Sequence, residues 1–279
     1  MRVKGMRYAV CALPFLLLQS CFQTRPKTPA VDPPRPLIAS TAPIQPIESA
    51  AGIKPPTLTN FEISGIQFEG ISFDSRADRL VVIDQSGGPG SEFPDTAAAA
   101  KSVAALAAAN AGFFTPEGAP LGFVVARGRS SGSWNSASSL GSGIWYEKPS
   151  GETAICRREH LGKTNASAMR ELLQAGPLLV ENQQPVPGLE ATKSSARTLI
   201  LWDGGTRWWL GRSSPCPLAG LASAIVKGQP AGWKVRLALN LDGGRSADLW
   251  ISPQIHGGPL VRRTPWNRPV RNFIALIPR

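Results

Sequence analysis

The sequence contains few of the residues that build metal centres. Its 279 residues include only four cysteines and two histidines. The histidines, His160 and His256, stand far apart, and no cysteines have the close spacing of a zinc ligand set. These shortages argue against a structural zinc site. The sequence identifies no cofactor, and it does not decide whether the protein binds a divalent cation.

Nucleotide-binding fingerprints are also missing. The chain has neither the glycine-rich loop that cradles phosphates nor the G-x-G-x-x-G pattern of dinucleotide sites. The formal net charge is +11, which favours anionic partners such as a charged substrate or an acidic surface polymer. No nucleic-acid-binding motif accompanies this charge. We therefore expect no nucleic-acid partner.

The longest apolar segment near the N-terminus is too short to span a membrane. Three basic residues among the first seven precede the apolar run Tyr8–Leu18. This pattern is typical of an export signal, predicted over residues 1–20, and Cys21 follows it. The arrangement resembles a bacterial lipoprotein signal, which predicts lipidation of Cys21 and a membrane-anchored, exported protein of the cell envelope. A plain secretory peptide cut nearby is the alternative.

A proline-rich stretch separates this signal from the rest of the chain. Residues 24–56 contain nine prolines, a composition that stays extended and buries no core. We therefore predict a tether over residues 21–57 and a single domain over residues 58–279. Removing residues 1–20 takes away three basic residues and no acidic ones, which lowers the net charge from +11 to +8.

The domain consists mostly of short apolar runs with period two, separated by Gly and Pro, which indicates strands. Helices are predicted at residues 95–109, with Asp95 as N-cap, and at 167–175 and 217–227. The order of elements predicts an α+β fold: a single domain with a twisted mixed or antiparallel β-sheet and a few packed helices. Whether Cys156 and Cys216 pair is left open.

The segment VRLALNLDGGRSADLW, residues 235–250, contains the most informative carboxylate. Asp-Gly-Gly between apolar runs is a strong hairpin signal, and the chain has a second example at residues 203–205. In an extended strand Leu237, Leu239 and Leu241 share one face, so Asn240 and Asp242 lie side by side on the other. The pattern leaves two interpretations of Asp242 open, a turn residue and a site residue.

GRSSG at residues 128–132 fits the G-x-S-x-G pattern of a serine hydrolase. Asp242 and His256 follow Ser130 in the chain order of that triad. The residues after Ser130 form helices poorly, although the nucleophile turn should lead into a helix. A serine esterase using Ser130 is therefore the least supported function.

Seven segments, in order, resemble the phosphodiester glycosidase family and cover the chain after the tether. They are NAGFF (110–114), APLGFVVARGR (119–129), QAGPLLV (174–180), ARTLIL (196–201), SPCPLAGLASAI (214–225), NLDGGRS (240–246) and RNFIALIP (271–278). The resemblance implies a hydrolase of sugar-1-phosphodiester bonds, with an anionic glycan or sugar phosphodiester as partner. For an exported protein we expect the bond to lie in an envelope glycan or exopolysaccharide.

The resemblance also implies the site residues. Asp242 is the expected acid, base or charge-stabilising carboxylate, Arg197 the cation that orients the phosphate, and Asn110 a third catalytic residue that holds a hydroxyl. The implied substrate-binding residues are Gly112, Gln174, Gly176, Asn240, Gly243, Gly244, Arg245 and Ser246. For a second carboxylate, Glu117 and Asp248 are candidates by proximity.

Two positions depart from the family pattern. Arg245 replaces a glycine, which adds a phosphate contact or blocks a substrate of the lysosomal type, and Ala111 replaces another, which limits backbone freedom. The alternative function is a non-catalytic glycan-binding or envelope-assembly lipoprotein. The eight tryptophans support it mildly, because aromatic faces stack on sugars.

Overall fold

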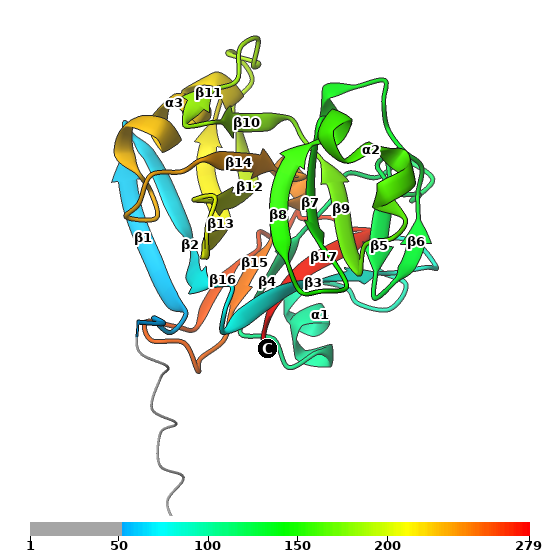
Figure 1. The fold of residues 1–279 in the computed structure, drawn as a ribbon. Coiled ribbons are helices and arrows are strands. Elements are labelled where there is room, and N and C mark those ends of the chain that lie inside the picture. Colours follow the sequence, from blue (N-terminus) through cyan, green and yellow to red (C-terminus); the bar gives the residue numbers. More distant parts are fainter. Residues whose placement is uncertain (1–51) are drawn as a thin grey trace, which may run out of the picture. The chain divides into compact units, whose positions relative to one another are not determined.

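Three antiparallel β-sheets account for most of the regular structure in a computed structural model that describes residues 52–279 (Figure 1). The signal, Cys21 and most of the tether lie outside the described residues. The α+β class is confirmed, with helices as minor elements. The expectation of one sheet is wrong, because the strands form three sheets. All strand pairs in these sheets are antiparallel.

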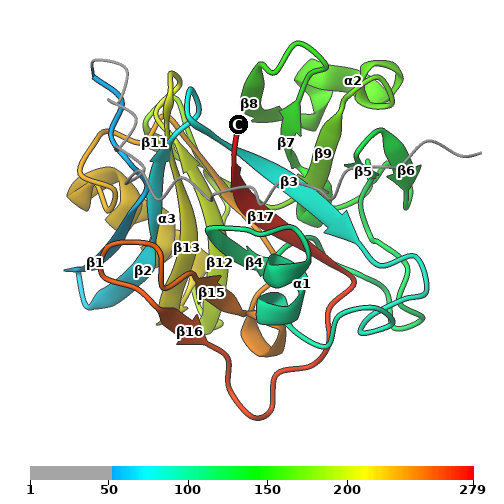
Figure 2. The same ribbon diagram turned by 90° about the horizontal axis from the view of Figure 1, so that it is seen from below.

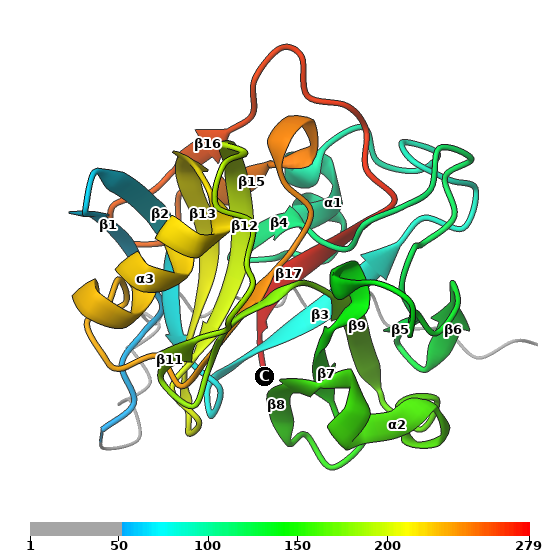
Figure 3. The same ribbon diagram turned by 90° about the horizontal axis from the view of Figure 1, so that it is seen from above.

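The first sheet has seven strands, and helix α3 (Leu218–Gly228) covers one of its faces (Figure 3). The strand order is β1 (Thr57–Ile63), β2 (Ile66–Asp74), β13 (Arg207–Cys216), β12 (Ser195–Trp202), β14 (Leu237–Asn240), β10 (Leu178–Glu181) and β11 (Gln184–Pro185).

The second sheet has five strands and packs helix α1 (Thr96–Ser102) against β4 and β17 (Figure 2). Its order is β16 (Leu260–Arg262), β15 (Leu249–Ile251), β4 (Ala107–Asn110), β17 (Asn272–Pro278) and β3 (Asp78–Asp84). The third sheet has the order β6 (Arg129–Ser131), β5 (Val124–Ala126), β9 (Glu171–Ala175), β7 (Gly143–Glu147) and β8 (Thr153–Arg157). Helix α2 (Arg158–Ala166) follows β8 in the chain. Two short 3-10 helices complete the fold, η1 (Ser139–Gly141) and η2 (Gly244–Ser246).

A central core joins the three sheets. It contains Leu237, Leu239 and Leu241 of the β14 segment together with buried residues of the second and third sheets. Ala238, on the other face of β14, belongs to a separate cluster beneath α3. The predicted alternation of this strand is therefore confirmed, and it directs Asn240 and Asp242 away from the central core.

The predicted helices have mixed outcomes. The Asp95 cap is confirmed, because its Oδ1 accepts a hydrogen bond from the Ala98 amide at 2.8 Å. The helix predicted at residues 217–227 is confirmed as α3, which spans Leu218–Gly228. The first helix, however, ends at Ser102, and Ala107–Asn110 forms strand β4. The helix predicted at 167–175 is wrong: Glu171–Ala175 is strand β9, fully buried between β5 and β7, so sheet pairing overrides its helical propensity.

One buried acid makes stability depend on pH. Asp78 begins β3 with 3% of its surface exposed, and its Oδ2 has no hydrogen-bond partner among residues 52–279. Burial, and next the negative charge of Asp74, raise the pKa of Asp78 to about 6, while Arg279 opposes them.

Asp78→Asn should remove a specific pH dependence. Because the folded-state pKa lies above the unfolded value, the folded protein binds more protons between about pH 4 and pH 6. Stability contributed by the neutral acid is therefore lost as pH rises through that window, by on the order of 3 kcal/mol at pH 7. Denaturant unfolding at pH 4 and pH 7 should show this loss in the wild type and a smaller one in the variant. An equal loss in both proteins would contradict this assignment.

Candidate functional site

The two Asp-Gly-Gly turns have different structures. Asp203 closes the hairpin between β12 and β13, where its Oδ1 accepts from the Gly205 amide at 2.7 Å and its Oδ2 pairs with Arg207 at 2.7 Å. Asp242 follows β14 and starts a crossover through η2 into β15 of another sheet (the short orange coil in Figure 3). Only the first turn is an ordinary hairpin, and the second carries Asp242 to a junction of two sheets.

The Asp242 carboxylate is buried and only partly satisfied. Its Oδ1 accepts from the Gly243 amide at 2.8 Å, whereas its buried Oδ2 has no hydrogen-bond partner within residues 52–279. The Arg268 guanidinium lies 3.7 Å from Oδ2. Burial raises the pKa of Asp242, and the nearby Ser246 hydroxyl and Arg268 charge oppose it to a smaller extent. A carboxyl with a raised pKa and a free oxygen is suited to proton transfer.

The glycines of this turn are required by close packing. A Cβ at Gly243 would collide with the Ala196 carbonyl and lie 3.3 Å from the Arg197 Cδ atom. Gly244 has a φ of +58°, a conformation that favours glycine. These residues hold the turn against the start of β12, which places Asp242 beside Arg197.

Arg197 is a partly buried cation with spare hydrogen-bonding capacity. Its Nε is buried without a partner among the described residues, and one terminal nitrogen makes a long 3.5 Å contact to the Lys193 carbonyl. Burial lowers the pKa of Arg197. The side chain lines a cavity of about 670 Å³ that also contains Arg157, Lys193 and Glu190. A guanidinium in this position can bind an anionic group between the cavity and the turn.

Asn110 ends β4 and faces the interior, with 0% of its surface exposed. Its Nδ2 donates to the Asp242 carbonyl at 2.7 Å, and its Oδ1 accepts from the Thr198 hydroxyl at 2.6 Å and the Asp248 amide at 3.0 Å. The side chain therefore ties the Asp242 turn to two neighbouring strands. Asn110 can therefore hold Asp242 in place, and none of its side chain is exposed for contact with a hydroxyl of a bound sugar.

Gln174 is likewise surrounded by protein. Its Oε1 accepts from the Phe123 and Asn135 amides, both at 2.9 Å, and its Nε2 donates to the Asn135 and Gly141 carbonyls at 2.8 and 2.9 Å. The side chain organises the loop before η1. It makes all four of its hydrogen bonds within the protein.

Asn240 and Gly112, which were also expected in the site, make hydrogen bonds within the protein. Asn240 donates from Nδ2 to the Gly176 carbonyl at 2.8 Å, while its buried Oδ1 has no partner in the described chain. The Gly112 amide donates to Oδ1 of Asn272 on β17 at 2.7 Å. Ala111 has no positive φ, so its backbone conformation does not require a glycine. Its carbonyl accepts from the Asp242 amide at 2.9 Å.

Sequence reasoning missed Arg268. This residue lies in the loop between β16 and β17, where its Nε donates to the Ser246 hydroxyl at 3.1 Å. Its guanidinium lies 4.6 Å from the centre of the Phe114 ring, and its side chain is 49% exposed. No local signal marks it, because a proline-containing loop brings it to Asp242 from 26 positions further along the chain.

Neither candidate for a second carboxylate is free beside Asp242. Asp248 is buried, and its Oδ2 accepts from the Thr96 amide at 3.1 Å and pairs with Arg263 at 2.7 Å, which fixes the start of α1. Glu117 is exposed in the loop after Phe114. Within residues 52–279 no three His, Cys, Asp or Glu side chains form a cluster able to hold a metal ion.

The Ser130 segment lacks the structure that an esterase needs. Ser130 lies on the edge strand β6, and a loop rather than a helix follows it. His256 lies in the connection between β15 and β16, next to Gly257, which faces Leu58 of β1. The thiols of Cys156 and Cys216 are free, and burial raises the pKa of Cys156 to about 11.

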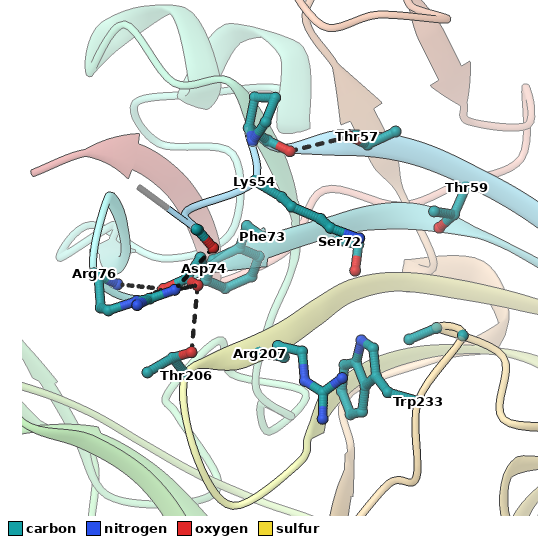
Figure 4. A pocket seen from close by; sticks show the side chains of 14 residues that line it. Lys54, Thr57, Thr59, Ser72, Phe73, Asp74, Arg76, Thr206, Arg207 and Trp233 are labelled. Atoms are coloured by element: carbon teal, nitrogen blue, oxygen red, sulfur yellow. Dashed lines mark hydrogen bonds and ion pairs between the residues drawn. The ribbon is translucent and has the colours of Figure 1, made fainter. Parts of the chain in front are cut away.

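A second cavity of about 540 Å³ is lined by residues of β1, β2 and the start of β13 (Figure 4). Its arginines are already paired, Arg76 with Asp74 at 2.6 Å and Arg207 with Asp203 at 2.7 Å, and Arg207 also stacks on Trp233. Asp242 and Arg197 do not line it. We therefore place the candidate site at the Asp242 turn.

Comparisons with known proteins match the chain to one family and to several solved structures. The family model for phosphodiester glycosidase matches residues 104–277, which include the turn and Arg197. The structure is similar to the zebrafish N-acetylglucosamine-1-phosphodiester alpha-N-acetylglucosaminidase catalytic domain, auto-inhibited by its pro-peptide, with TM-score 0.56 and 16% identity over 84% of this chain and 86% of that one.

Two bacterial structures share the fold. A hypothetical protein from Synechocystis has TM-score 0.53 and 18% identity, over 80% of this chain and 61% of that chain. A protein from Burkholderia pseudomallei, described as a candidate exported protein, has TM-score 0.50 and 15% identity, over 76% and 74%. No curated protein sequence matches the chain significantly.

Proposed function

The chain belongs to the phosphodiester glycosidase family, and we propose that it hydrolyses sugar-1-phosphodiester bonds with Asp242 as the central acid–base residue. The observation that carries this proposal is the buried Asp242 Oδ2, which has no hydrogen-bond partner in residues 52–279 and lies near two arginines. Burying an unsatisfied carboxylate oxygen costs free energy, so a function at this position accounts for it.

In the proposed reaction, water attacks the anomeric carbon and the bond from that carbon to the phosphate oxygen breaks. The products are the free sugar and a phosphate monoester, and the proton from water ends on the phosphate. Arg197 and Arg268 bind the charged phosphate, while Asp242 transfers the proton or stabilises positive charge at the sugar carbon. Asn110 holds the Asp242 backbone in place.

The substrate that we propose is a glycosyl phosphodiester in an envelope glycan or exopolysaccharide. A formal net charge of +8 after removal of residues 1–20 favours an anionic polymer. Export through the N-terminal signal and lipidation at Cys21 would place the enzyme in the envelope with such a polymer. Within residues 52–279, no helix is long and apolar enough to cross a membrane.

Arg197→Ala should raise the KM for a small sugar-1-phosphodiester by about 10- to 100-fold, because a charge-assisted hydrogen bond contributes about 1.5–3 kcal/mol. Hydrolysis of the methyl ester of N-acetylglucosamine-1-phosphate by the full-length chain measures this. Arg207→Ala is the matched control, since Arg207 lies at the other end of the same sheet. Equal KM values for wild type and Arg197→Ala would contradict the phosphate-binding role.

A further inference from the structure

The loop between β16 and β17 presents a tryptophan to solvent beside the site. Trp266 is 66% exposed, and Val261 on β16 is the other exposed large apolar residue within residues 52–279. Single exposed apolar side chains are common on protein surfaces, so exposure alone indicates no function. What distinguishes Trp266 is the way its backbone is held.

Hydrogen bonds fix the loop on both sides of the exposed ring. The Trp266 carbonyl accepts from Arg245 Nε at 3.1 Å, and the Asn267 side chain donates to the Ala247 carbonyl at 2.7 Å. The Arg268 amide donates to the Arg245 carbonyl at 3.0 Å. The loop therefore rests on η2, the segment that follows Asp242. An aromatic side chain on a fixed backbone loses little conformational entropy when it binds a ligand.

The same contacts connect Trp266 to the reaction centre. Arg268, two positions after Trp266, reaches to 3.7 Å from the Asp242 Oδ2 atom. Arg245, three positions after Asp242, is exposed, and its terminal nitrogens have no hydrogen-bond partner among the described residues. Hydrogen bonds thus link Trp266, Arg245 and Arg268, which we call the Trp266 strip, and Arg268 brings the strip next to Asp242.

We propose that the Trp266 strip is a subsite for a sugar ring adjacent to the phosphodiester that is cleaved. The enzyme would then prefer an extended anionic glycan to a small glycosyl phosphodiester. The apolar face of the sugar packs on the indole, Arg268 contacts the phosphate of the cleaved bond, and Arg245 contacts a neighbouring phosphate of the polymer. This inference rests on the proposed function and deepens it. It also gives Arg245, where the family pattern has glycine, a role in holding and extending the subsite.

The test compares Trp266→Ala with the wild-type full-length chain on two substrates with the same scissile bond. One is the methyl ester of N-acetylglucosamine-1-phosphate, and the other is a polysaccharide whose repeats are joined by N-acetylglucosamine-1-phosphate bonds. We expect kcat/KM for the polymer to fall by about 10-fold through KM, with the small ester unaffected. Trp266→Phe should recover part of the loss, and Val261→Ala should change neither activity.

Each outcome decides between the inference and its alternatives. Equal losses on both substrates would mean that Trp266 acts through folding or the common site, and no loss on either would mean that the subsite is absent. Both results overturn the inference. If the wild type cleaves neither substrate, the proposed function fails. Calorimetry of polymer binding by the wild type and Trp266→Ala then tests whether the Trp266 strip binds the polymer. Weaker polymer binding by Trp266→Ala then supports the subsite, while unchanged or undetectable binding overturns it.

Discussion

Asp242→Asn should abolish hydrolysis without weakening the fold. We expect kcat for a sugar-1-phosphodiester to fall by about 10²–10⁴-fold, the usual contribution of a positioned acid or base. The amide is close in size to the carboxylate and carries no charge. Because burial already raises the pKa of Asp242 and Oδ2 has no hydrogen-bond partner in residues 52–279, the substitution removes a desolvation cost. Thermal unfolding should therefore show an equal or higher Tm.

The chain supplies a matched control for this experiment. Asp203→Asn changes the same residue type in the other Asp-Gly-Gly turn, where the carboxylate closes a hairpin and pairs with a surface-exposed Arg207. We expect wild-type activity and a stability loss of no more than about 1 kcal/mol. An active Asp242→Asn enzyme, or loss of activity in both variants, would contradict the distinction between the two turns.

Asn110→Ala should strongly destabilise the protein. The substitution leaves three buried groups without partners: the Asp242 carbonyl, the Thr198 hydroxyl and the Asp248 amide. Each unsatisfied buried group costs about 1–3 kcal/mol, so the free energy of unfolding should fall by about 3–9 kcal/mol. Denaturant unfolding measures this loss.

Thr198→Val is the milder companion to this variant. It removes only the hydrogen bond from the Thr198 hydroxyl to Asn110 Oδ1, so we expect a loss of about 1–2 kcal/mol. If Asn110 positions Asp242, kcat should fall in both variants in the order of their stability losses while KM stays nearly constant. An Asn110→Ala protein of wild-type stability with a raised KM would instead indicate direct contact with substrate.

Local patterns predicted the parts of the fold that depend on neighbouring residues. The alternation of Leu237, Leu239 and Leu241 is confirmed because each strand face meets a different core, and the Asp95 cap is confirmed because it needs only its own helix. The helix predicted at residues 167–175 failed for the opposite reason. Its state is decided by β5 and β7, which lie far away in the sequence.

The candidate site shows the same limit. The two-residue periodicity of a strand predicted that Asn240 and Asp242 lie on one face. The family resemblance then selected Asp242 rather than Asp203, although both stand in Asp-Gly-Gly segments typical of hairpins. Sequence did not reveal that Asn110 and Gln174 direct their hydrogen bonds into the protein. It also missed Arg268, because only the folded loop brings that cation within 3.7 Å of Asp242.

The most direct test of a sugar-1-phosphodiester hydrolase is to identify the bond that breaks. The full-length chain is incubated with the methyl ester of N-acetylglucosamine-1-phosphate in ¹⁸O-labelled water, and the products are analysed by mass spectrometry. Attack of water at the anomeric carbon predicts label in the free sugar and none in methyl phosphate, with this release lost in Asp242→Asn. Label in the phosphate, or no hydrolysis by the wild type, would contradict the account.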